Sequence, residues 1–207
     1  KSSRIKEPVR YLQDQGYLSI VKTDPLKIKN EIKLTEKEID KLKQGFDFSD
    51  NTIKKIENNE IRNLLILKKI KKYYLQGKSI IVFAASLDNC SLLCDMANIL
   101  NIKSCSIDKE TSMINRRKFI QMFRDGETKV LFNYGVLTTG FDAPNTDVVV
   151  IARPTSSPVL YNQMIGRGIR GKEVGGNDVC ILVDVIDNIV GMPNESYTFS
   201  MFRDYYS

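Results

Sequence analysis

The sequence has no histidine and only four cysteines among its 207 residues. Cys90 and Cys94 are spaced one helical turn apart, but two thiols without further ligands make a poor zinc site, so no metal site is predicted. All four cysteines (Cys90, Cys94, Cys105 and Cys180) fall in apolar segments. This placement favours buried free thiols in a reducing cytoplasm.

Long apolar runs are also missing. No segment approaches the ~18 consecutive apolar residues that a membrane-spanning helix needs. The N-terminal residues show no signal-peptide pattern. We therefore expect a cytoplasmic protein with no membrane partner.

The composition is that of a globular domain with a basic surface. Hydrophobic residues make up 42% of the chain, enough for one α/β domain with an appendage. A core of this size needs no disulfides or metals to stabilise it. The net charge of +6 favours a polyanionic partner. A lysine-rich genome would produce the same excess, so composition leaves both interpretations open.

Residues 1 to about 50 are charged and only weakly patterned, and a lysine-rich run follows from Ile53 to Gln76. The pattern predicts a short helix around Val9, an extended piece at Leu18 to Lys22, a capping box at Thr35 to Glu38 that begins a helix to Lys43, and one or two helices from Ile53 to Gln76 that end at Gly77. The charges of this segment keep surface helices in water.

From Ser79 onward, apolar strands alternate with helices. The continuous apolar run Ile80 to Ala84 is typical of a strand buried on both faces. Further strands are predicted at Ser104 to Ile107, Lys129 to Asn133, Asp147 to Ala152 and Asp178 to Val183, with helices at Leu87 to Leu100, from Ser112 to Arg124, and from Pro158. Such alternation implies an α/β fold with a parallel sheet and right-handed crossovers.

The stretch Tyr161 to Gly171 concentrates a glutamine and two arginines, Gln163, Arg167 and Arg170. The arginines are spaced as i and i+3, so on a helix both would lie on one face and could bind one anion. The planar guanidinium suits phosphate. In isolation, an Arg-x-x-Arg pair on a helix is ordinarily solvated charge.

A second stretch precedes it, from Val136 to Pro144. Thr138 and Thr139 offer hydroxyls and backbone amides suited to a nucleic-acid phosphate. Gly140 allows close approach of a ligand, and Asp142 is suited to a ribose hydroxyl or a partnering arginine. By itself the stretch would be a plain turn.

Together the two stretches resemble motifs V and VI of superfamily 2 helicases and translocases. The similarity is greatest to the branch with type I and type III restriction-enzyme motors and DNA-repair helicases. The family patterns Thr-x-Gly-x-Asp-x-Pro and Gln-x-x-Gly-Arg-x-x-Arg match position for position, joined by Ala152 to Thr155, and the resemblance spans roughly residues 78–186.

The resemblance implies a RecA-like parallel sheet with helices on both faces, preceded by a charged, mostly helical connector. It divides the chain into an interlobe connector at residues 1–77, a helicase C-terminal RecA-like domain at 78–190 and a tail at 191–207. In full length, such a protein is an ATP-dependent helicase or translocase.

The same resemblance assigns roles to individual residues. Arg170 is implied to be the arginine finger, Arg167 a second contact to the γ-phosphate, and Gln163 a neighbour of the attacking water. Gly140 and Asp142 join the two arginines in binding the nucleotide.

Nucleic acid is implied to contact Thr138, Thr139 and Ser86. Ser86 lies in the segment that matches motif IV, where capping of the following helix is favoured and nucleic-acid contact is the alternative. DNA is favoured over RNA by the restriction- and repair-like motifs. Strand separation and simple tracking both stay open.

The chain lacks a credible P-loop and a tandem acidic box. ATP and Mg²⁺ are therefore expected in a cleft shared with an N-terminal RecA-like lobe that precedes Lys1 and holds the magnesium. This fragment alone is predicted not to hydrolyse ATP.

Two other hypotheses stay open. One is a non-catalytic nucleic-acid-binding or regulatory module, against which the intact Gln163, Arg167 and Arg170 argue. The other is a nicotinamide-dependent oxidoreductase, suggested by the spacing Gly-x-Gly-x-x-Gly that ends at Gly171. A near P-loop overlaps the same stretch, but Glu173 replaces its Ser or Thr, and both patterns need a preceding strand where a helix is predicted.

Overall fold

The structure, a computed structural model, describes residues 8–136 and 146–190. Four candidate site residues, Thr138, Thr139, Gly140 and Asp142, lie outside the described residues, as does the predicted tail. Their roles remain predictions.

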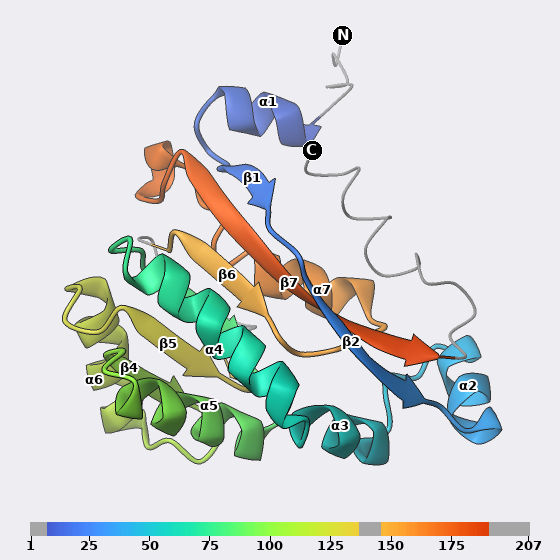
Figure 1. Ribbon diagram of the computed structural model, residues 1–207. Helices are drawn as coiled ribbons and strands as arrows, with labels where there is room; N and C mark the ends of the chain where they lie inside the picture. The colour runs from blue at the N-terminus through green and yellow to red at the C-terminus, as the bar shows by residue number, and fades with distance from the viewer. Residues whose placement is uncertain (1–7, 137–145, 191–207) are drawn as a thin grey trace, which may run out of the picture.

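The centre of the molecule is a seven-stranded, mostly parallel sheet (Figure 1). The strand order is β1-β7-β6-β3-β5-β4, and β2 pairs with the second half of β7. The strands are β1 (Ile20–Thr23), β2 (Leu26–Lys33), β3 (Ile80–Phe83), β4 (Ser104–Ile107), β5 (Val130–Asn133), β6 (Val148–Ile151) and β7 (Val179–Val190).

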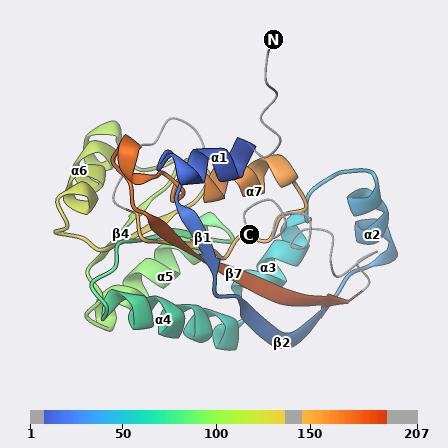
Figure 2. The same cartoon turned by 90° about the horizontal axis from the view of Figure 1, so that it is seen from above.

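Helices cover both faces of this sheet, as Figure 2 shows from above. Helices α4 and α5 lie on one face, and α6 and α7 lie on the other. The helices are α1 (Pro8–Asp14), α2 (Glu36–Lys43), α3 (Asp50–Glu57), α4 (Glu60–Tyr74), α5 (Leu87–Ile99), α6 (Met113–Arg124) and α7 (Pro158–Ile165), with a 3-10 turn at Lys172–Val174. The predicted RecA-like parallel sheet with helices on both faces is confirmed.

The core has two layers because side chains alternate across each central strand. In β3, Ile80 and Val82 point to the layer under α4 and α5, whereas Ile81 and Phe83 point to the layer under α6 and α7. All four are at most 2% exposed. The prediction that this apolar run is a strand buried on both faces is confirmed.

The charged N-terminal segment contributes β1 and β2 to the same sheet, both along β7. The residues between them include Pro25, which has no amide to donate. The register then slips within β2, between Lys27 and Glu31. The sequence pattern predicts an extended piece here but not β2, and it places the end of β7 at Val183 instead of Val190. The boundary at residue 78 stays a prediction.

Polar side chains connect these N-terminal elements. The capping box predicted at Thr35 is present and begins α2, with Glu38 at its third position. Glu38 also accepts hydrogen bonds from the hydroxyls of Ser49 and Thr52, which tie α2 to the start of α3. Hydrogen bonds from Ser49, Thr35 and Thr52 lower the pKa of Glu38 to about 2.

The four cysteines are buried and unbridged, as predicted. Burial raises the pKa of Cys90, Cys105 and Cys180 to about 12, so these thiols stay protonated. In the described ranges, no helix combines the length and the apolar character that crossing a bilayer requires.

Candidate functional site

Helix α7 carries the first part of the predicted motif VI. Ser157 caps it, since its hydroxyl accepts the amide of Leu160, and Pro158 occupies the first turn. Buried Tyr161 and Met164 face the sheet, and Gln163 is half-buried. The helix therefore presents Gln163 beside the core without burying it completely.

The prediction that the two arginines lie on one face of a helix is wrong. Helix α7 ends at Ile165 with Gly166 as its C-cap, so Arg167 and Arg170 follow the helix. The physical reason is Gly168, where a Cβ would collide with Val149 and come within 2.9 Å of the Cys180 sulfur. The chain leaves the helical path to pack this glycine against β6 and β7.

We call residues 166–171 the arginine loop. Its backbone is fixed from the N-terminal side of the protein, because Leu18 forms an antiparallel bridge with Arg170. The amide of Ser19 donates to the carbonyl of Ile169 at 2.9 Å, and the amide of Gly171 donates to the carbonyl of Tyr17 at 3.0 Å. Arg167 and Arg170 are both half-buried. The same short segment therefore carries both guanidinium groups on a main chain held by these hydrogen bonds.

Close packing accounts for the glycines that imitate nucleotide fingerprints. A Cβ on Gly168 would collide with Val149, and one on Gly171 would collide with the carbonyl of Gly16. These glycines follow α7, whereas both fingerprints need a strand before the loop. The glycine spacing therefore reflects close approach of two chain segments.

The other end of α7 is fixed by Asp47, in the connection between α2 and α3. One carboxylate oxygen of Asp47 accepts the amide of Ser156 at 2.8 Å, and the other accepts the hydroxyl of Thr155 at 3.0 Å. Ser156 also donates its hydroxyl to the carbonyl of Phe46. The segment before residue 60 thus contacts the motif VI segment at both of its ends.

A buried carboxyl group lies beneath α7. The hydroxyl of Tyr161 donates to Oδ2 of Asp184 at 2.6 Å, and Oδ1 of Asp184 is buried without a partner among the described residues. Burial raises the pKa of Asp184 to about 7, although the hydrogen bond from Tyr161 acts in the opposite direction. Asp184 is therefore a group that titrates near neutral pH next to the candidate site.

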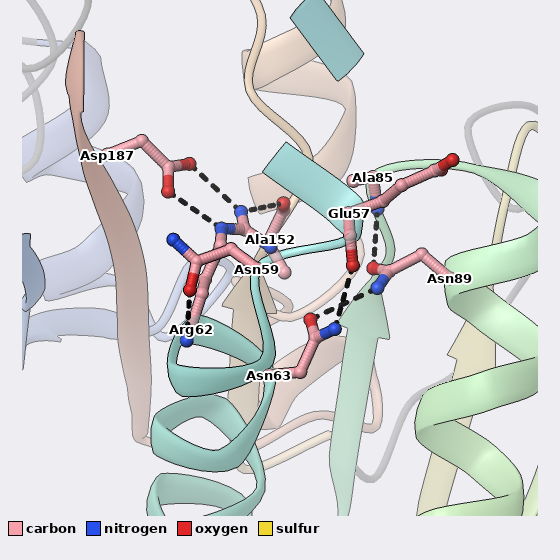
Figure 3. A network of polar contacts seen from close by, with 8 residues as sticks. All are labelled: Glu57, Asn59, Arg62, Asn63, Ala85, Asn89, Ala152 and Asp187. Atoms are coloured by element: carbon pink, nitrogen blue, oxygen red, sulfur yellow. Dashed lines mark hydrogen bonds and ion pairs between the residues drawn. The ribbon is translucent and has the colours of Figure 1, made fainter. Parts of the chain in front are cut away.

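A polar network crosses the carboxyl ends of the central strands (Figure 3). Arg62 of α4, which is fully buried, donates through Nε and Nη2 to the two oxygens of Asp187 at 2.7 and 3.0 Å. The same Nη2 donates to the carbonyl of Ala152 at 2.6 Å. Beside it, Asn63 accepts a hydrogen bond from Asn89 at 3.1 Å. Arg62 thus connects α4 to the ends of β6 and β7.

Ser86 begins α5 in the segment that matches motif IV. Its hydroxyl accepts the amide of Asn89 at 3.0 Å, which confirms the predicted capping role. Its nucleic-acid contact stays a prediction. Nearby at this edge of the sheet, the guanidinium of Arg153 lies 5.0 Å from the centre of the Tyr134 ring.

The residues that support the motif are not identified by the sequence pattern; they are Ser19, Asp47, Arg62 and Asp184. Two of them carried a detectable signal. Asp184 interrupts an otherwise apolar run, and Ser19 stands between Leu18 and Ile20. A polar residue inside an apolar segment indicates a specific buried partner, but the partner itself was not visible in the sequence.

The decisive comparison is with protein-family models. Residues 57–172, more than half of the chain, match the model described as the helicase conserved C-terminal domain. The chain belongs to this family. The predicted resemblance to superfamily 2 helicases is thereby confirmed, and its match includes α4, β3, α7 and the arginine loop.

Individual helicase relatives show the same similarity. IRC3 of Saccharomyces cerevisiae, a candidate ATP-dependent helicase by its name, is 34% identical over 142 residues, which are 68% of this chain and 20% of IRC3. The pre-mRNA-splicing ATP-dependent RNA helicase PRP28 of Pyricularia oryzae is 29% identical over 57% of this chain and 17% of its own. The chain thus spans about a fifth of the length of these two relatives.

Solved structures show the same fold. A fragment of a candidate HsdR subunit of a type I restriction enzyme from Vibrio vulnificus superposes with a TM-score of 0.61. The match covers 96% of this chain and 36% of the HsdR fragment, at 19% identity. At this identity the similarity concerns the fold alone.

Proposed function

We propose that this chain is the C-terminal lobe of an ATP-dependent helicase or translocase and supplies the arginine finger to an ATP site shared with an N-terminal RecA-like lobe of the same polypeptide. The observation that carries the proposal is the arginine loop, whose two arginines are fixed on ordered backbone at the end of α7. Family membership supports it, and the limited coverage of the helicase relatives leaves room for a second lobe.

The groups at the loop suit a nucleoside triphosphate. Arg170 is proposed to neutralise charge that develops during phosphoryl transfer, with Arg167 as a second contact to the γ-phosphate and Gln163 near the attacking water. Gly140 and Asp142 are proposed to contact the nucleotide. Mg²⁺ would be held by the N-terminal lobe, since the sequence lacks a P-loop and an acidic box.

We propose that the protein moves along DNA, which is its track, and that Thr138, Thr139 and Ser86 contact this DNA. The support is the sequence of motifs V and VI, together with the excess of positive charge. RNA is the second candidate, because PRP28 is named as an RNA helicase. A cytoplasmic location likewise stays a proposal.

The test is ATP hydrolysis by the full-length protein, alone and with duplex DNA, single-stranded DNA or RNA. Arg170→Ala is expected to lower kcat by on the order of 10³-fold, because a finger arginine acts on the transition state. The matched control is Arg117→Ala, an exposed arginine of α6, which should leave kcat at saturating nucleic acid unchanged.

Each outcome decides one element of the proposal. The nucleic acid that stimulates turnover most identifies the track. Turnover that is insensitive to Arg170→Ala would show that the finger assignment is wrong. If no nucleic acid elicits turnover, the non-catalytic binding or regulatory module becomes the better hypothesis. Robust ATP hydrolysis by residues 1–207 alone would contradict the need for a second lobe.

A further inference from the structure

The buried hydroxyl of Ser19 connects the N-terminal segment to two main-chain carbonyls, one in the arginine loop and one shortly after it. Oγ of Ser19 lies 2.7 Å from the carbonyl oxygen of Arg170 and 2.6 Å from that of Asn177. Ser19 is only 1% exposed, although it lies between α1 and β1 near the surface of the fold. Its one proton is shared between two main-chain acceptors.

Main-chain contacts surround this hydroxyl. The amide of Ser19 donates to Ile169, and the amide of Asn177 donates to the same Arg170 carbonyl at 3.0 Å. Gly176 packs against Arg170 so tightly that any side chain there would collide with it. The peptide of Arg170 is therefore held on one side by Ser19 and on the other by residues 176–177.

We propose that Ser19 is a positioning residue for Arg170, acting through the Arg170 main chain. The inference rests on the proposed function, in which the Arg170 guanidinium contacts the γ-phosphate. Loss of the hydroxyl removes the side-chain hydrogen bond from Ser19 to the Arg170 carbonyl. The loop backbone then gains freedom, and the guanidinium at the end of a long side chain moves further than the backbone does.

The expected effect is on turnover more than on binding. Misplacement of a reacting group by about 1 Å can lower a rate by about 10²-fold. Ser19→Ala should therefore lower the kcat of the full-length protein by about 10-fold to 100-fold while KM for ATP changes by about 2-fold or less. Ser19→Thr, which keeps the hydroxyl, should recover much of the lost kcat.

The matched control is Ser104→Ala. Ser104 also donates its hydroxyl to a main-chain carbonyl, that of Cys94, but it lies in β4 at the opposite edge of the sheet from β1. If the Ser19 hydroxyl only stabilises the fold, both variants should lower the melting temperature and neither should lower kcat at constant KM. Only Ser19→Ala should separate kcat from KM.

A double-mutant cycle with Arg170→Ala distinguishes this inference from the proposed function. If Ser19 acts through Arg170, Ser19→Ala should have no further effect on kcat in the Arg170→Ala background. If Arg170→Ala alone leaves turnover unchanged, the proposed finger is wrong and the inference falls with it. If Arg170→Ala abolishes turnover while Ser19→Ala retains the wild-type kcat, only the positioning role of Ser19 is overturned.

A milder variant covers the case in which Ser19→Ala does not fold. The half-buried side chain of Gln13 donates to the carbonyl of Ser19 at 3.2 Å and so holds the main chain of Ser19 itself. Gln13→Ala should lower kcat by about 3-fold with KM unchanged, by the same positioning argument. A wild-type kcat in Gln13→Ala, if Ser19→Ala does not fold, would overturn the proposal.

Discussion

The central strands of the sheet and its N-terminal edge, formed by β1 and β2, differ in residue composition and in exposure. Strands β3, β5 and β6 are wholly buried and consist almost entirely of apolar residues. Strands β1 and β2 are mostly exposed and rich in lysine, and polar side chains of neighbouring segments connect them to the rest of the fold. Charged edge strands resist pairing with other chains.

This difference separates stability from placement of the site. The central strands bury the side chains that stabilise the fold, and α7 packs on them. The edge contributes less apolar burial, but residues 16–19, beside β1, contact the arginine loop directly. We therefore expect core substitutions to affect the whole fold and edge substitutions to affect stability only modestly.

The largest effect is expected from a cavity in the centre. Phe132 of β5 is fully buried, so Phe132→Ala should lower the free energy of unfolding by about 4 kcal/mol. The matched control is Phe46→Ala, since Phe46 is 59% exposed, and its change should stay within about 0.5 kcal/mol. Urea denaturation of both variants measures the difference. Equal losses would contradict the conclusion that burial in the central strands stabilises the fold.

A slightly smaller effect is expected where α4 meets the ends of β6 and β7. Arg62→Ala leaves the carboxylate of Asp187, whose side chain is 2% exposed, without its partner, and should cost about 3 kcal/mol. The double variant Arg62→Ala, Asp187→Ala should recover part of this loss, because no buried charge is left. The exposed pair of Lys43 and Asp40 provides the control, and Lys43→Ala should be nearly neutral.

For the double variant, the decisive quantity is the coupling energy from denaturation of all four members of the cycle. Additive losses would mean that the network in Figure 3 contributes only packing.

A third effect depends on pH and concerns the carboxyl group beneath α7. Burial raises the pKa of Asp184 to about 7 from an ordinary value of 3.8. The unfolded chain therefore loses this proton at lower pH than the folded chain, so stability falls as pH rises from about 4 to 7. Asp184→Asn keeps an acceptor for Tyr161 but has no charge, and it should be more stable than wild type by about 2 kcal/mol at pH 8.

The measurement is melting temperature against pH for wild type and variant. The gain should shrink towards pH 5, where wild-type Asp184 is protonated in the folded state. Asp178→Asn, at an exposed position just before β7, is the control and should follow the wild-type profile. A gain that is the same at pH 5 and pH 8 would point to packing instead of ionisation.

The sequence allowed the central part of the fold to be predicted because its signals are local. Continuous apolar runs marked β3, β5 and β6, and capping residues such as Ser112 marked helix starts. The second half of β7 was missed because Asp184 and Asp187 interrupt its apolar pattern. Each of these aspartates has a partner on a helix distant in sequence, which no local pattern reveals.

The residues of the candidate site could be identified from the sequence, but their arrangement in space could not. The residue types of motif VI identified Gln163, Arg167 and Arg170, whereas helical periodicity suggested the wrong geometry for the arginines. The end of α7 depends on the fit of Gly168 against Val149 and Cys180, a contact between distant segments. For the same reason Ser19 was not recognised, since its hydrogen bonds join positions 151 and 158 residues apart.

The smallest predicted effect concerns the attachment of the edge itself. Asp24, between β1 and β2, accepts hydrogen bonds from Lys69, Lys72 and Tyr73 of α4. Burial alone would raise the pKa of Asp24, but the hydrogen bonds from Lys69, Tyr73 and Lys72 outweigh it and lower the pKa to about 2. The folded pKa lies below the unfolded value of 3.8, so this contribution is present above about pH 4 and is lost as pH falls through 2.

Asp24→Asn should therefore destabilise the chain by about 1 kcal/mol at pH 7, a figure reduced for screening because the Asp24 side chain is 31% and Lys72 54% exposed. The difference from wild type, followed by urea denaturation, should narrow between pH 4 and pH 2. Asp40→Asn is the matched control in an exposed pair and should be neutral throughout. A loss that persists unchanged at the lowest pH would mean that Asp24 attaches the edge through neutral hydrogen bonds, and that its charge contributes nothing to the contrast between edge and centre.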